Sequence, residues 1–247
     1  MAARTFLAAG LSAAMASLAA VAYLLWLPDA SALKTQNPTT TTYTALYARR
    51  MARRGKKAGT AMRWVPLAGI SPHLVKAVLI AEDDRFWRHR GIDWYELNPI
   101  LLANLRGEEP QRGASTISQQ VARNLFLSPK RSYGRKGREM LIARHLERTL
   151  GKERLLEIYL NIVEWGEGIF GAEAAAQAYF ERAAADLTPE QAVSLAAALP
   201  SPYDRNPSVE PDERLLKLRR VYLERLRLKE GGLPAAAAAP PPPVQPL

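Results

Sequence analysis

Residues 71–91 of this 247-residue chain read SPHLVKAVLIAEDDRFWRHRG, and this stretch predicts the fold class. Ser71 followed by Pro72 is typical of a helix start, with serine at the N-cap and proline at the first helical position. Gly91 predicts the break that ends the segment. Between these signals, apolar residues recur on one helical face at Leu74, Val75, Val78 and Leu79.

Helical patterns continue along the chain on both sides of this stretch. We predict helices over 94–105, 115–127, 133–150, from 155 onward, from 188 onward and over 212–229. Gly166, Gly168 and Gly171 predict a flexible turn, and no segment alternates convincingly with period two. The predicted fold is therefore mainly α, with one domain over 43–230.

The N-terminal region predicts a membrane anchor. Thr5 to Leu27 is a run of 23 residues without a charge, and a helix needs about 20 to cross a bilayer. A cleaved signal peptide is the alternative, because Ala30-Ser31-Ala32 fits a cleavage site, but signal cores usually span about 7–15 residues. We expect residues 1–28 to form a short cytoplasmic tip and a transmembrane helix, 29–42 a linker, and 231–247 a disordered Ala/Pro tail.

Composition restricts the chemistry. The chain has 34 Lys and Arg against 24 Asp and Glu, so nucleic acid, anionic headgroups and phosphorylated substrates are all candidate partners. The absence of cysteine excludes disulfides, cysteine-bound zinc and a thiol nucleophile. The three histidines are too widely spaced to suggest a local metal site. The basic run over 49–57 (RRMARRGKK) is either a headgroup contact or a solvated stretch.

The first candidate site is the acidic group Glu82, Asp83 and Asp84 at the end of the first predicted helix. The negative end of the helix dipole and the neighbouring like charges both disfavour ionisation there. A carboxyl group in that position tends toward a raised pKa, which suits general acid or base catalysis near neutral pH. Composition alone favours the alternative, a solvated acidic turn paired with Arg85, Arg88 and Arg90.

Two further clusters follow. Over 112–124 (RGASTISQQVARN), helical spacing places Thr116, Gln120 and Asn124 on one face with Gln119 and Arg123 paired beside it. This is either a polar wall for a sugar or an ordinary solvent-facing helix. In residues 135–139 (RKGRE), the alternatives are a surface ion pair contributing a few tenths of a kcal/mol, and a cationic pocket for phosphate oxygens.

Taken together, these segments closely resemble the peptidoglycan glycosyltransferase family (family 51) in its monofunctional biosynthetic form. Five motifs occur in the family's order over roughly residues 70–205. The first three are ED-x-x-F-x-x-H-x-G at Glu82, Asp83, Phe86, His89 and Gly91, RG-x-STI-x-QQ within Arg112–Asn124, and RK-x-x-E at Arg135, Lys136 and Glu139. The fourth lies in Lys152–Asn161 (KERLLEIYLN) and the fifth in Gly168–Phe180.

The resemblance implies a lysozyme-like, mostly helical domain that acts on lipid II, a disaccharide-pentapeptide on undecaprenyl pyrophosphate. Glu82 would deprotonate the 4-hydroxyl of the acceptor sugar, which attacks the anomeric carbon of the growing chain and inverts it to a β-1,4 bond. Glu139 would stabilise the pyrophosphate region directly or through Mg²⁺ or Mn²⁺, although no cofactor is required. Arg123, Arg135 and Lys136 would neutralise phosphate charge. The implied substrate-binding set also contains Asp83, Phe86, His89, Ser115, Thr116, Gln119, Gln120 and Asn124.

Arg123 departs from the family, which usually has lysine there, so a planar fork replaces a compact ammonium. The resemblance further implies a single-pass protein of the bacterial inner membrane with a periplasmic catalytic domain. Its partners would be lipid II, the growing glycan strand and a transpeptidase or division proteins, and no nucleic acid. Two alternatives are a lysozyme-like glycan hydrolase and a non-catalytic, membrane-tethered basic scaffold.

Overall fold

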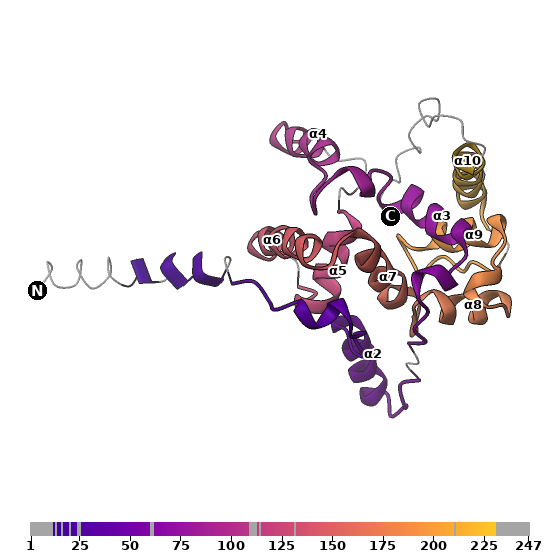
Figure 1. Cartoon of the computed structure of the whole chain (residues 1–247), viewed down its shortest axis with the longest axis horizontal. Coiled ribbons are helices and arrows are strands. Elements are labelled where there is room, and N and C mark those ends of the chain that lie inside the picture. Colours follow the sequence, from indigo (N-terminus) through magenta and orange to yellow (C-terminus); the bar gives the residue numbers. More distant parts are fainter. Residues whose placement is uncertain are drawn as a thin grey trace, which may run out of the picture.

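The computed structural model describes residues 12, 14–15, 17–19, 21–23, 26–59, 62–108, 113, 115–130, 132–209 and 211–230. Across these residues the chain is mainly helical, which confirms the predicted fold class (Figure 1). The longer helices are α2 (Thr42–Arg53), α3 (Pro72–Glu82), α4 (Trp94–Leu105), α5 (Ile117–Phe126), α6 (Tyr133–Leu150), α7 (Lys152–Ile162), α8 (Ala172–Phe180), α9 (Pro189–Ala198) and α10 (Glu213–Glu230). Short 3-10 helices are η1 (Ser31–Lys34), η2 (Leu67–Gly69), η3 (Phe86–Arg88) and η4 (Ala184–Asp186).

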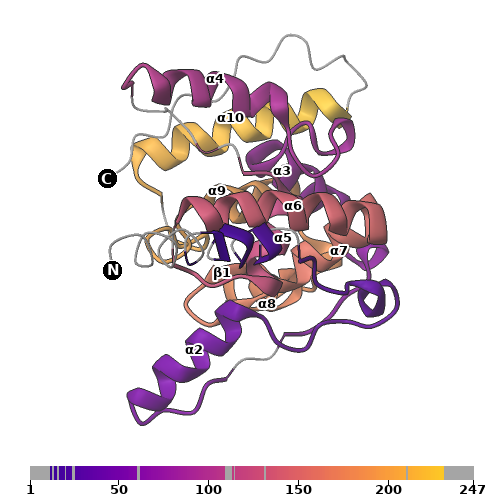
Figure 2. The same ribbon diagram turned by 90° about the vertical axis from the view of Figure 1, so that its left-hand side faces the viewer.

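Two groups of helices build one core. Helix α3 packs against α9 and α10, and α5 packs against α6 and α7 (Figures 1 and 2). The predicted apolar stripes face inward, because Leu74 and Val78 of α3 and Ile142 and Leu146 of α6 are fully buried. Helix α7 is buried along most of its length, with Leu155, Leu156, Ile158, Tyr159, Leu160 and Ile162 in the core. These contacts hold the C-terminal end of α3 beside the N-terminal half of α5.

The start of α3 differs from its prediction. Ser71 does not cap the helix with its side chain. Its hydroxyl instead donates to the Leu187 carbonyl (2.9 Å), and its backbone N–H donates to the Ala184 carbonyl (2.9 Å). Ser71 therefore ties α3 to the segment before α9, a tertiary contact that local spacing does not reveal. By contrast, the predicted capping box of Thr188 and Gln191 at the start of α9 is confirmed.

The glycine-rich turn contains a short β-hairpin that the sequence did not predict. Strands β1 (Glu164–Gly166) and β2 (Ile169–Phe170) pair antiparallel. Strands of two or three residues are too short for an alternating pattern to be recognised. Gly168 has φ +77, and a Cβ on it would lie 2.5 Å from the ring of Tyr47, so this turn needs glycine for both conformation and space.

The predicted linker before α2 lies against the domain. Ala30 is buried, and the guanidinium of Arg154 on α7 donates from Nε to the Leu33 carbonyl (2.8 Å) and from Nη2 to the Gln36 carbonyl (2.9 Å). Thr41 then caps α2 in a capping box with Thr44. Residues 29–42 are therefore held by the domain along this part of their course.

Within the described part of the chain, no helix is both long and apolar enough to cross a bilayer. Most of the predicted span over 5–27 lies outside the described residues, as does the tail over 231–247. The described N-terminal residues reach α6, where Arg138 donates to the Tyr23 carbonyl (2.6 Å) and its guanidinium carbon lies 4.0 Å from the centre of the Tyr23 ring. The N-terminal segment extends away from the domain on the side where α4 and α6 lie, at the left of Figure 1.

Candidate active site

Glu82 is the last residue of α3, and its half-buried carboxylate meets α5. The Gln120 amide donates from Nε2 to Glu82 Oε2 at 2.6 Å. Burial raises the pKa of Glu82, and the hydrogen bond from Gln120 and the positive charge of Arg123 oppose that rise. The direction agrees with the prediction, but burial is the main cause, and the negative charge of Asp83 adds less.

Asp83 faces the other way and is buried. Its carboxylate accepts the backbone N–H of Ile117 (Oδ2, 2.9 Å) at the first turn of α5 and lies 3.0 Å from Nε2 of His89. A carboxylate at a helix N-terminus satisfies a free N–H and suits the positive end of the dipole. Asp83 therefore joins α3 to α5. This bond also fixes the position of Glu82, the preceding residue, relative to α5.

Asp84 completes the acidic group; it is exposed, as the solvated-turn alternative expects, but its partners are other than the arginines next to it in the chain. Its carboxylate pairs with Arg225 (2.7 Å) and Lys229 of α10. The predicted partners behave differently, since Arg85 pairs with Asp93 (3.0 Å). The three neighbouring acids thus point to three different parts of the molecule.

His89 lies at the centre of a buried network of charged side chains. Its Nδ1 is 3.4 Å from Nζ of Lys152 at the start of α7 and 3.6 Å from Oε1 of Glu147 on α6. Lys152 also donates to Glu147 (2.6 Å), and Ser118 of α5 donates to the same carboxylate oxygen (2.5 Å). Because the ammonium of Lys152 can only donate, its contact uses the lone pair of Nδ1, and Nε2 is the nitrogen that donates to Asp83. Four helices are thereby connected behind Glu82.

Two side chains of the predicted polar wall, Thr116 and Gln119, instead fix the start of α5. Thr116 and Gln119 form a capping box, and both are buried. The Thr116 hydroxyl also donates to the Gly91 carbonyl (2.7 Å). Gly91 has φ +87, and a Cβ there would lie 2.8 Å from the Arg144 backbone, so this motif position requires glycine. Gln119 accepts from Thr116 rather than pairing with Arg123.

Glu139 forms the centre of a second cluster on α6. It is fully buried and accepts from Arg135 (2.7 Å) and from Lys136 (2.5 Å), one cation on each oxygen. Nζ of Lys136 also donates to the Ser115 hydroxyl (2.8 Å), just before α5. The surface ion-pair alternative is therefore wrong, because the carboxylate lies in the interior, beside a mostly buried Arg135 and a partly exposed Lys136.

Helix α5 connects the two clusters. Ser115 touches Lys136, and Gln120, five positions later, touches Glu82. Ser115 lies two residues before α5 and Gln120 lies in its first turn, so at about 1.5 Å per helical residue the two contacts are ~8 Å apart along the chain direction. The acidic centre and the cationic centre therefore both lie at the N-terminal end of α5 instead of on opposite sides of the domain.

The remaining predicted site residues lie on or beside the same elements. Arg123 and Asn124 occupy the second half of α5, and Asn124 is buried. Phe86 is fully buried, with Nζ of Lys152 4.2 Å from its ring centre. Among the described residues, Nε of Arg123 and Nε of Arg135 are buried without a hydrogen-bond partner. Buried donors of this kind are suited to an anion.

The donor set does not fit a divalent cation. Both oxygens of Glu139 already accept from cationic side chains, and Asp83 is committed to α5 and His89. In the described ranges, no three His, Asp or Glu side chains are arranged to hold a metal ion. Divalent cations prefer several unpaired oxygen ligands, which these carboxylates do not offer.

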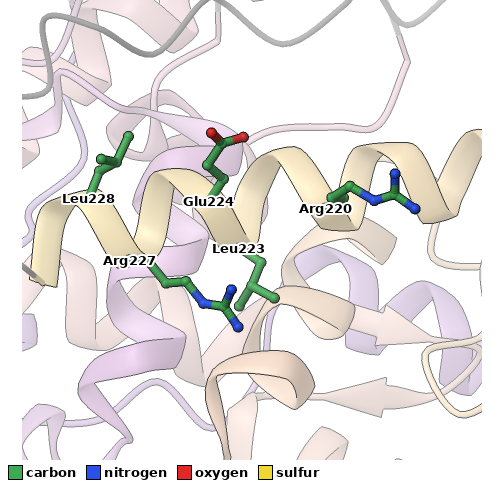
Figure 3. A pocket seen from close by; sticks show the side chains of 5 residues that line it. All are labelled: Arg220, Leu223, Glu224, Arg227 and Leu228. Atoms are coloured by element: carbon green, nitrogen blue, oxygen red, sulfur yellow. The ribbon is translucent and has the colours of Figure 1, made fainter.

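A separate hollow lies on the outer face of α10. Its lining side chains all come from that one helix, with Leu223 and Arg227 on one side and Glu224 and Leu228 on the other, as Figure 3 shows together with Arg220. None of the predicted site residues is among them. The chemistry therefore concentrates around α5, and this hollow is unrelated to it.

Comparison with known proteins agrees with this arrangement. The family model described as Transglycosylase matches residues 48–227. The chain belongs to the transglycosylase family. Proteins named biosynthetic peptidoglycan transglycosylase are similar over most of their length: that of Azoarcus sp. (strain BH72) is 48% identical over 200 residues, 77% of this chain and 86% of the relative. Those of Dechloromonas aromatica (44% over 176 residues; 70% and 76%) and Brucella suis biovar 1 (47% over 163 residues; 66% and 72%) are also similar.

The resemblance seen in the sequence is thus confirmed, and the matched region contains every element of the transglycosylase site described above. Sequence reasoning gave no role to Lys152 or Tyr159, although both lie in the fourth motif, and it did not single out Glu147 or Ser118. No local signal identifies these side chains, because their partners come from other helices. The rest of the fourth motif is structural, since Asn161 donates to the Val65 carbonyl (2.9 Å).

Proposed function

We propose that this transglycosylase is a peptidoglycan glycosyltransferase with a lysozyme-like domain. It polymerises lipid II into β-1,4-linked glycan strands for the cell wall, with inversion and release of undecaprenyl pyrophosphate. The observation that carries the proposal is that Glu82 of α3 and the Lys136–Glu139 cluster of α6 bond to side chains five positions apart at the start of α5. A base and a cationic phosphate site at such a separation suit transfer from a sugar pyrophosphate.

In the proposed reaction, Glu82 removes the proton from the 4-hydroxyl of the acceptor sugar. The oxygen attacks the anomeric carbon of the donor from the face opposite the pyrophosphate, and the bond between carbon and pyrophosphate oxygen breaks with its electrons. A carboxyl group whose pKa burial raises is a stronger base once ionised, which suits this step near neutral pH. Arg135 and Lys136 stabilise the negative charge that develops on the leaving group.

The two cations are held in place before substrate arrives. Glu139 is fully buried beneath them, so we assign it to positioning Arg135 and Lys136 and not to contact with phosphate. Fixed charges need no reorganisation as the leaving group departs, which makes them effective in the transition state. Because the donor set does not fit a divalent cation, polymerisation is expected to persist after chelation with EDTA.

The predicted substrate-binding residues divide into two groups by their contacts. Ser115, which accepts from Lys136, Arg123, whose positive charge acts on Glu82, and Asn124, on the same helix as Arg123, are assigned to substrate. Asp83, Phe86, His89, Thr116 and Gln119 are buried and bonded or packed within the protein, which supports a role in shaping the site. Gln120 forms neither group: it donates a hydrogen bond to Glu82, the proposed base, and is assigned to holding that carboxylate.

We further propose that residues 1–28 anchor the chain in the bacterial inner membrane with the domain on the periplasmic side. A transpeptidase or division proteins would work with it there. Support comes from Arg138, which binds the carbonyl and the ring of Tyr23. Arg138 lies on α6, three positions after Arg135. A lipid-linked substrate would then present its pyrophosphate to α6 close to the membrane. The exposed apolar side chains of α4 also support a membrane-facing side of the domain.

Incubation of the full chain with purified lipid II tests the proposed function. Glu82→Gln is expected to lose nearly all polymerisation, whereas Glu224→Gln, an exposed change on the outer face of α10 (Figure 3), should behave like the wild type. Substantial polymer from Glu82→Gln would remove Glu82 as the base. If the wild type makes no polymer but shortens finished glycan strands, the hydrolase alternative is correct, and absence of both activities would favour the scaffold.

A further inference from the structure

Helix α7 contributes a buried phenol next to the acidic centre. Tyr159 is fully buried, and its hydroxyl lies 3.4 Å from Oε1 of Gln120. The other end of the same amide, Nε2 of Gln120, lies 2.6 Å from Oε2 of Glu82. Three side chains from α7, α5 and α3 thus form a line that ends on the proposed base.

Hydrogen-bonding capacity fixes the direction of this line. The amide of Gln120 has an acceptor at one end and donors at the other, and a half-turn of the amide exchanges them. An ionised carboxylate can only accept, so Glu82 requires the NH₂ end. Burial, with the nearby charge of Glu82, raises the pKa of Tyr159 well above its usual range, so its phenol keeps its proton and can donate. Only one amide orientation satisfies both neighbours.

We propose that Tyr159 is a positioning residue for Glu82: its hydroxyl donates to Oε1 of Gln120 and so holds the amide with its NH₂ group against the catalytic carboxylate. The proposal rests on the role of Glu82 stated under Proposed function. Without the phenol, the amide can turn and present its oxygen to Glu82. That oxygen repels an ionised carboxylate but accepts a hydrogen bond from a protonated carboxyl group. The protonated, inactive form of Glu82 is therefore stabilised relative to the ionised form.

The other charged groups around Glu82 remain in place when the phenol is removed. Arg123 on α5 favours the ionised form, and Asp83, next in the chain, opposes it. Neither of them forms a hydrogen bond with the Gln120 amide, whereas the Tyr159 hydroxyl lies at its oxygen. The phenol should therefore favour the ionised form of Glu82 only through Gln120, so its effect should disappear when Gln120 is replaced.

Tyr159→Phe keeps the ring and removes only the hydroxyl. We expect the acidic limb of the pH–rate profile for lipid II polymerisation to move to higher pH, with a rate about tenfold lower on that limb, as the loss of a bond to a charged group would give. The KM for lipid II should be unchanged. Gln120→Met should move the limb in the same direction, and the combined variant should move it no further than Gln120→Met alone.

Tyr179→Phe is the matched control, because Tyr179 also loses a hydroxyl hydrogen bond, to the Trp165 carbonyl (3.0 Å), away from Glu82. Its pH profile should match the wild type. A folded Tyr159→Phe with the wild-type profile, or effects of Tyr159→Phe and Gln120→Met that add in full, would overturn the proposal. If Tyr159→Phe does not fold, an unchanged profile for Gln120→Met overturns it instead. In each case an inactive Glu82→Gln would leave the proposed function intact.

Discussion

At the scale of single residues, Glu82 combines catalytic use with a cost to the fold. Burial raises its pKa, so the folded chain holds the proton more tightly than the unfolded chain, whose glutamate pKa is about 4.3. The resulting stability is fully present below that value and is lost as pH rises through the raised folded-state pKa. At neutral pH the ionised side chain therefore destabilises the fold relative to a neutral one.

We expect Glu82→Gln to have a melting temperature about 2–4 °C above the wild type at neutral pH, the change that ~1 kcal/mol gives in a domain of this size. The difference should shrink near pH ~4, where both side chains are neutral. Thermal unfolding followed by circular dichroism at the two pH values measures it. An equal or lower melting temperature at neutral pH would show that Arg123 and Gln120 fully compensate the buried charge.

Lys136 is the residue on which the proposed phosphate site depends most. Lys136→Met should lower polymerisation about 100-fold, as the loss of one preorganised charge-stabilising donor commonly does. Lys136→Arg keeps the charge but places a planar fork between Glu139 and Ser115, so partial activity is expected. The control is Lys130→Met in the exposed loop before α6. Equal rates of lipid II polymerisation for Lys136→Met and Lys130→Met would refute the site.

At the scale of elements, the Lys152 network holds four helices together. Lys152→Met leaves the carboxylate of Glu147, whose side chain is 7% exposed, without its ammonium partner. The free energy of unfolding should fall by about 3 kcal/mol, because a lone buried charge is costly. Adding Glu147→Gln should recover part of the loss, since no uncompensated charge then remains.

Urea unfolding measures these differences, with Lys217→Met on the exposed face of α10 as the control. A double variant that is destabilised by the sum of the two single changes would contradict the network. If Lys152→Met loses more polymerisation activity than folded protein, the contact between Asp83 and the start of α5 has been displaced.

The elements also show how far the sequence could predict the fold. The limits of α4 and α6 agree with the predicted ranges, because long apolar stripes and a stop at Gly151 are local signals. The β-hairpin and the side-chain bond of Ser71 to Leu187 depend on contacts between distant segments. The same holds for part of the site: the pair of Arg135 and Glu139 is local to one helix, but the bond of Gln120 to Glu82 and that of Lys136 to Ser115 join separate elements.

At the scale of the whole molecule, apolar surface gathers on one side. Helix α4 exposes Trp94, Tyr95, Leu101, Leu102 and Leu105, and Trp87 in η3 is also exposed. Helix α4 lies toward the side from which the N-terminal segment leaves, while α10 lies on the far side (Figures 1 and 2). A cluster of large exposed apolar side chains marks a surface for another apolar phase. We therefore expect α4 to rest on the bilayer that carries the substrate.

Leu101→Glu tests this orientation, because Leu101 is 45% exposed and the change should cost little folding stability. Leu216→Glu is the control, with the same 45% exposure, on α10, which lies on the far side from α4 in Figure 1. In vesicles that contain lipid II, Leu101→Glu should polymerise several-fold more slowly than Leu216→Glu, because a carboxylate opposes contact with the membrane. In detergent solution the two should be equally active, since substrate no longer lies in a continuous bilayer. Equal rates in vesicles would mean that α4 does not face the membrane, and a Leu101→Glu defect that persists in detergent would place α4 in substrate binding instead.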